Sequence, residues 1–221
     1  MFGMPVREAL DQPFSSTRPA KVCGYLFMCV LLSCSFPKGG WRSWAAPIVA
    51  AGWSAVPCAL VGLLLVALVW GLLKQVKWAW LHWSWLSLWG AETCNINVKP
   101  MTYGKWSAVP YMLILAAALP SICAWEEGVF RAGTSGWLNA AWRSAAFGLV
   151  HWTAGCPLSA CAAIGTVGLW FSYLYMSAGL VQCVATHIAY NGIVLCCVFA
   201  GVLAKGKAGG TAAGATDGLE A

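Results

Sequence analysis

Charged residues are scarce in this chain. They make up 9% of its 221 residues, whereas hydrophobic residues make up 60%. An ordinary soluble domain carries roughly 25% charged residues. A soluble globule could not cover its surface with so few charges, so the composition excludes a soluble enzyme or binding domain, and it also excludes a disordered chain. We expect an all-α, multi-pass integral membrane protein with about six spans of roughly 20 residues each.

Sequence motifs for soluble metal and redox sites are absent as well. The 11 cysteines form no CxxC pair, which argues against a zinc ribbon or a thioredoxin-like site. Most of them lie in apolar runs, where cysteine behaves as a small hydrophobe. Lys and Arg exceed Asp and Glu by 13 to 7, but the basic residues lie mostly between apolar runs. This placement is typical of charges that flank membrane helices, and no nucleic-acid partner is expected.

The first half of the chain is predicted to contain a polar arm followed by the first membrane helices. The arm covers residues 1–20, and the region that follows it covers 22–106. An apolar run of marginal length for a span occupies 22–36, and a longer apolar run occupies 44–73. A polar loop at 91–106 ends this region.

The segment 74–90 is rich in tryptophan. In a helix, its residues Trp78, His82, Trp85 and Trp89 would share one face. Because tryptophan prefers the membrane–water boundary, we expect a helix lying at the interface. We assign His82 no chemical role.

The second half is predicted to contain the functional core, residues 107–203. Its four expected helices lie near 107–131, 137–154, 158–177 and 179–203. The turn at Ser177-Ala178-Gly179 is very short, so the last two helices are expected to be antiparallel neighbours. The low-complexity tail, 204–221, is expected to be disordered.

Ionisable residues inside the apolar helices point to a site, because a bare charge in lipid costs several kcal/mol. Glu127 and Arg131 are four residues apart with the acid first, which suits a pair on one helix face. Glu126 is rotated by about 100° from Glu127. We therefore predict that Arg131 holds Glu127 while Glu126 points elsewhere.

Two further polar pairs follow at the same helical spacing. Phe147 stacks one turn from His151, and His187 lies one turn from Asn191. Their estimated depths in the helices allow these groups and Glu126 to converge. Each feature alone could merely join helices by hydrogen bonds. Together, two Glu, two His, an Asn and an Arg are hard to explain in that way.

The order EExxxR, FxxxH and HxxxN resembles the CAAX-processing and bacteriocin-processing protease family (CPBP, also called Abi). The first motif is matched by Glu126, Glu127 and Arg131, the second by Phe147 and His151, and the third by His187 and Asn191. The resemblance covers about residues 107–200 and implies an intramembrane endopeptidase. Some members remove the C-terminal tripeptide after a prenylated cysteine, whereas others process different substrates or act as non-proteolytic partners.

Each of the polar residues in these motifs can take a role in peptide hydrolysis. This reaction requires a base for water, a proton donor for the leaving amine and donors for the oxyanion. Glu126 can be the base, and His151 can share the water and pass on its proton. His187 and Asn191 can donate to the oxyanion. The supporting residues are Glu127, Arg131 and Phe147.

Two alternatives remain open. Zinc could be held by Glu126, His151 and His187, but the chain contains no HExxH, so a glutamate mechanism without a cofactor is favoured. The second alternative is a catalytically silent membrane scaffold of the same fold. Membrane lipids and a peptide or prenylated-protein substrate are the expected partners. The sequence leaves open the substrate, the membrane and the face to which the site opens.

Overall fold

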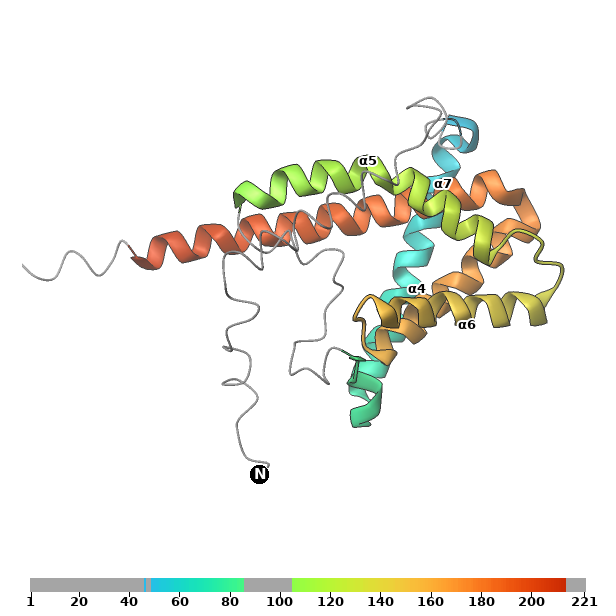
Figure 1. The fold of residues 1–221 in the computed structure, drawn as a ribbon, viewed down its shortest axis with the longest axis horizontal. Coiled ribbons are helices and arrows are strands. Elements are labelled where there is room, and N and C mark those ends of the chain that lie inside the picture. Colours follow the sequence, from blue (N-terminus) through green and yellow to red (C-terminus); the bar gives the residue numbers. More distant parts are fainter. Residues whose placement is uncertain (1–45, 47–48, 86–104, 214–221) are drawn as a thin grey trace, which may run out of the picture.

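The computed structural model describes residue 46, residues 49–85 and residues 105–213 (Figure 1). These residues form helices and their connections, without a β-strand, which confirms the all-α class for this part of the chain. Three helices in these ranges are long and apolar enough to cross a membrane: Val49–Gln75, Ala108–Phe130 and Leu158–Val202. This finding supports a membrane protein, and the six spans stay a prediction. The polar arm and the run 22–36 lie outside the described residues.

The first described helix, α4 (Ala55–Gln75), follows a short 3-10 turn, η1 (Gly52–Ser54). Its inner face is made of small residues, and Ala59 and Gly62 there allow close contact with α7. Its outer face carries large side chains that stay exposed, including Leu64 and Leu68. Because lipid can cover such a face, the division into small and large sides fits a membrane helix packed on one side only.

The longest helix, α7 (Leu158–Ala213), is broken at Gly179, where φ is 83° and ψ is 176°. This backbone region is essentially restricted to glycine. The two halves of α7 contact each other across the break, since the rings of Phe171 and His187 lie 4.8 Å apart. The predicted turn at 177–179 is therefore confirmed as the place where one helix ends and its neighbour begins.

The second half of α7 is longer than expected. The helix continues to Ala213, whereas the sequence predicted its end near residue 203 and disorder beyond it. The sequence therefore placed the end of this helix too early. Disorder of the tail stays a prediction, and residues 214–221 lie outside the described residues.

Helix α5 (Lys105–Phe130) runs antiparallel to the second half of α7 (Figure 1). At one end of this pair, Glu127 contacts His187. Further along, Tyr111 and Leu115 belong to a buried cluster with Leu195. The pairing brings the first and third predicted motifs together.

Helix α6 (Trp137–Thr153) packs against the first half of α7 through small residues. The Ser144 and Ser172 hydroxyl oxygens lie 3.2 Å apart. A Cβ placed on Gly148 would lie 2.9 Å from the backbone nitrogen of Gly165, so the two backbones are nearly in contact. The helix predicted at 137–154 is confirmed as a helix, and its crossing of the membrane stays a prediction.

Residues 76–85 of the tryptophan-rich segment do not form the expected helix, and residues 86–90 lie outside the described residues. After Gln75 the chain becomes extended, and only a short 3-10 turn, η2 (Ala79–His82), follows before residue 86. The segment docks elsewhere: Trp85 Nε1 donates to the Thr153 carbonyl at 3.0 Å. The Trp83 carbonyl accepts from Leu158 N at 3.2 Å. These bonds to the α6–α7 connection satisfy backbone groups without a helix, which explains the difference.

Candidate functional site

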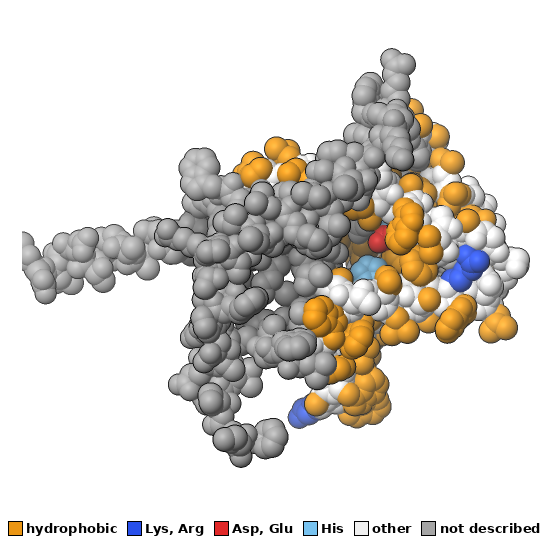
Figure 2. All heavy atoms as spheres, viewed as in Figure 1, with side chains coloured by type: hydrophobic (Ala, Val, Ile, Leu, Met, Phe, Trp, Pro, Cys, Tyr) orange, Lys and Arg blue, Asp and Glu red, His pale blue; other side chains and the backbone are white. Residues whose placement is uncertain are grey.

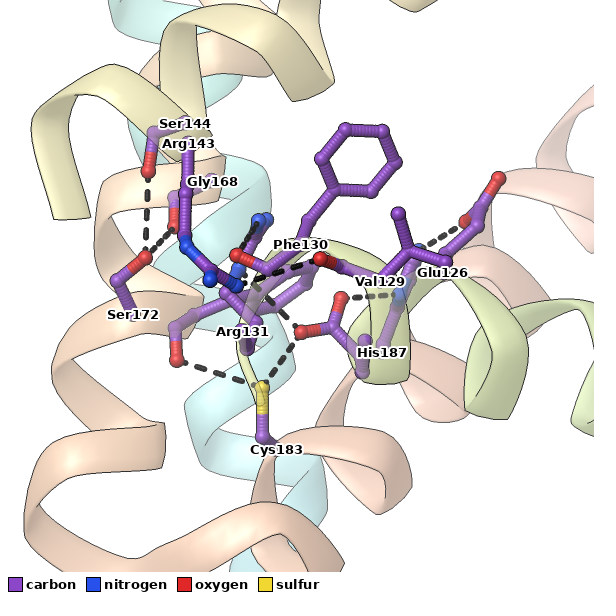
Figure 3. A network of polar contacts seen from close by, with 12 residues as sticks. Glu126, Val129, Phe130, Arg131, Arg143, Ser144, Gly168, Ser172, Cys183 and His187 are labelled. Carbon is purple, nitrogen blue, oxygen red and sulfur yellow. Dashed lines mark hydrogen bonds and ion pairs between the residues drawn. The ribbon is translucent and has the colours of Figure 1, made fainter. Parts of the chain in front are cut away.

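The site lies where the end of α5 meets α6 and both halves of α7, and Figure 3 shows Arg131, Cys183 and His187 there. Its centre is the fully buried carboxylate of Glu127. Three donors approach it. His187 Nδ1 lies 2.8 Å from Glu127 Oε1. Cys183 Sγ lies 2.8 Å from Oε2, and Arg131 Nε lies 3.3 Å from the same oxygen. A buried carboxylate surrounded in this way is held in its charged form and in one orientation.

Arg131 is fully buried as well, so the predicted pair with Glu127 is confirmed. Its guanidinium carbon lies 4.6 Å from the centre of the Phe147 ring, an arrangement that favours a cation. The side chain passes over Gly168, where a Cβ would lie 3.2 Å from Nη2. A glycine at this position of α7 therefore gives the arginine room to reach between the helices.

Glu126 takes no part in the Glu127–Arg131 ion pair, as predicted. Its Oε2 lies 3.5 Å from His187 Nε2, and the side chain is 18% exposed. His187 thus lies between the two glutamates and contacts one with each ring nitrogen. In the face seen in Figure 2, an acidic and a histidine side chain come to the surface next to each other, bordered by hydrophobic side chains.

His151 lies on α6, half-buried, and its orientation is set by its own helix. Its Nδ1 lies 2.8 Å from the Phe147 carbonyl oxygen. Because a carbonyl can only accept, Nδ1 carries the proton, and Nε2 of the neutral ring is an acceptor. The Phe147 ring meets both His151, at 5.0 Å, and His187, at 5.9 Å, edge to face. Both imidazoles therefore lie against the same phenyl ring.

Asn191 lies one turn beyond His187, on the same helix face, as the spacing predicted, and this face meets α5. It is half-buried, and its Nδ2 donates to Cys123 Sγ at 3.5 Å. A thiol sulfur is a weak acceptor, so this contact holds the amide only loosely. That Asn191 and His187 both donate hydrogen bonds to one oxyanion stays a prediction.

Sequence reasoning missed Cys183, because it treated the cysteines as packing residues. Cys183 is a free cysteine, and its thiol lies against the carboxylate of Glu127. A signal was present: Cys183, His187 and Asn191 recur at four-residue spacing and so line one face of a helix. That periodicity marks the face of α7 that meets α5.

Within residues 49–85 and 105–213, no group of three or more His, Cys, Asp or Glu side chains is placed so that it could hold a metal ion. The zinc alternative stays a prediction. No family model, curated protein sequence or solved structure matches the chain. The family resemblance therefore rests on the residue pattern.

Proposed function

We propose that this protein is an intramembrane endopeptidase of the CAAX-processing and bacteriocin-processing type, with Glu126 as the base that activates water. The observation that carries the proposal is the difference between the two adjacent glutamates. Glu127 is fully buried, hydrogen-bonded to His187 and Cys183 and ion-paired with Arg131. Glu126 reaches the surface and contacts His187 alone among the described ionisable groups. A base must reach water and have a free lone pair, and Glu126 meets both requirements.

The ring of His187 lies between the two carboxylates, with Nδ1 2.8 Å from Glu127 Oε1 and Nε2 3.5 Å from Glu126 Oε2. In the proposed reaction this ring donates from both nitrogens, so the mechanism requires a proton on each. Carboxylates on both sides of the ring would offset part of the free-energy cost of burying such a cation.

The proposed reaction uses these positions in order. Glu126 takes a proton from water, whose oxygen attacks the peptide carbonyl carbon, and His151 Nε2 accepts a hydrogen bond from the same water. The carbonyl oxygen becomes an oxyanion and receives hydrogen bonds from His187 Nε2 and Asn191 Nδ2. When the C–N bond breaks, the proton that Glu126 took from water passes through His151 to the leaving amine, and Glu126 returns to its carboxylate form. The chemistry needs no group beyond these side chains and water.

A silent scaffold is the second candidate, and one observation favours it. The Glu127–Arg131–His187 contacts join α5 to α7 and are fully buried, as expected of groups that hold helices together. Such a role would not require a partly exposed Glu126 beside His187. The two candidates therefore differ in what they predict for Glu126.

Cleavage of defined peptides by the purified protein tests the proposal. A peptide ending in a farnesylated CAAX sequence and its non-prenylated twin are incubated with the protein in detergent and in lipid vesicles, and the products are weighed by mass spectrometry. We expect release of a C-terminal fragment from at least one peptide. Two intact peptides in both environments would favour the scaffold.

A further inference from the structure

The Cys183 thiol has surroundings that packing alone does not explain. It is fully buried in α7, and its Sγ lies 2.8 Å from Glu127 Oε2 and 3.3 Å from the Phe171 carbonyl. A thiol is normally a weak donor, but a charged acceptor strengthens the bond. In Figure 3, two dashed lines leave the Cys183 sulfur and mark these two contacts.

Cys183 and His187 hold the same carboxylate from one helix face. They lie one turn apart on α7, and the thiol meets Oε2 while the imidazole meets Oε1. A carboxylate bound at both oxygens cannot rotate, so its plane is fixed relative to α7. Glu127 in turn orients the His187 ring, whose other nitrogen faces Glu126.

We propose that Cys183 is a positioning residue: its thiol fixes Glu127, and through Glu127 it aims His187 at Glu126. The effect on turnover rests on the proposed function, whereas the effect on the His187 ring does not. The thiol acts here as a hydrogen-bond donor, and no change in its oxidation state is involved.

Two substitutions separate this role from packing. Cys183→Ser keeps a donor but makes the side chain smaller and more polar. Cys183→Val keeps apolar volume but removes the donor. If the hydrogen bond to Glu127 matters, Cys183→Ser should preserve kcat and the His187 ring orientation better than Cys183→Val or Cys183→Ala. If packing matters, valine should be the best of the three.

The kinetic arm uses the cleaved peptide. We expect Cys183→Val and Cys183→Ala to lower kcat by about 10- to 100-fold with little change in KM, as is typical when a group that orients a site residue is lost. Cys183→Ser should stay within a few-fold of the parent. Cys161→Ala is the matched control, because Cys161 is also buried but its thiol faces the Cys156 carbonyl. It should keep its kcat.

The spectroscopic arm is independent of activity. The chain contains three histidines, so nitrogen-15 labelling of histidine gives three imidazoles to resolve by NMR. We expect the His187 signals to move in Cys183→Val and Cys183→Ala and to return in Cys183→Ser. The signals of His82, which contacts the Val76 carbonyl, should not move.

The results decide the proposal in either case. Unchanged His187 signals in Cys183→Val and Cys183→Ala would overturn it, and so would a kcat that follows side-chain volume rather than the presence of a donor. If the parent protein cleaves no peptide, the proposed function fails, but the NMR comparison still decides whether Cys183 orients His187.

Discussion

At the scale of single residues, the adjacent glutamates should respond differently to the same change. Glu127→Gln leaves Arg131 buried without its carboxylate, and removing one partner of a buried pair costs about 3–5 kcal/mol. We expect a clearly lower melting temperature in detergent for Glu127→Gln and a nearly normal one for Glu126→Gln, whose side chain is partly exposed. Equal melting temperatures would show that Glu127 does not anchor the site.

Asn191 provides a second test at this scale. Its described bond goes to a weak acceptor, Cys123 Sγ, so Asn191→Ala should cost little stability. If its amide donates to the oxyanion, kcat should fall by about 10²–10³ while KM changes little. Melting and single-turnover cleavage are measured on one preparation. A lower melting temperature with full kcat would assign Asn191 to helix packing instead.

Much of the candidate site follows from helical spacing. The Glu127–Arg131 pair was predictable because residues four apart share a face, and Glu126 was excluded from that face by its rotation. The contact of His187 with both glutamates was not predictable, because it depends on how α7 lies against α5. The role of Cys183 was hidden for the same reason.

At the scale of elements, the contact between α6 and α7 depends on glycine. A methyl group on Gly148 would meet the Cys161 carbonyl oxygen and the Gly165 backbone, neither of which can move without shifting a helix. We expect Gly148→Ala to lower stability by about 1–3 kcal/mol, the usual cost of overpacking. Activity should fall too, because α6 carries His151.

Gly71 in α4 is the control for this substitution. A Cβ there would meet nothing within 4 Å. Alanine is the better helix former, so Gly71→Ala should be neutral or stabilising by up to about 1 kcal/mol. The two variants are compared by thermal melting in one detergent. Equal melting temperatures would mean that α6 and α7 are less closely packed than the structure shows.

The helices themselves were largely predictable, whereas one segment was not. Long apolar runs and the glycine at the turn located α4, α5 and the break in α7. The interfacial helix predicted for the tryptophan-rich segment was wrong, because tryptophans spaced as in a helix can also occur in extended chain. Its hydrogen bonds to Thr153 and Leu158 come from the α6–α7 connection, far away in the sequence.

At the scale of the whole molecule, the account requires that the reaction proceed without a metal. EDTA or phenanthroline should leave turnover unchanged, and the purified protein should contain much less than one zinc per chain. Stoichiometric zinc that is lost in His151→Ala would support the zinc alternative and overturn the glutamate mechanism. Metal analysis and turnover are measured on the same samples.

The central claim is that Glu126 is the base, and single-turnover cleavage by the parent protein and by Glu126→Gln tests it most directly. The amide keeps the size of the side chain but cannot accept the proton. Both proteins are first shown to melt alike in detergent. We predict that the parent releases the C-terminal fragment and that Glu126→Gln loses nearly all of this activity. Cleavage by Glu126→Gln at close to the parent rate would contradict the account.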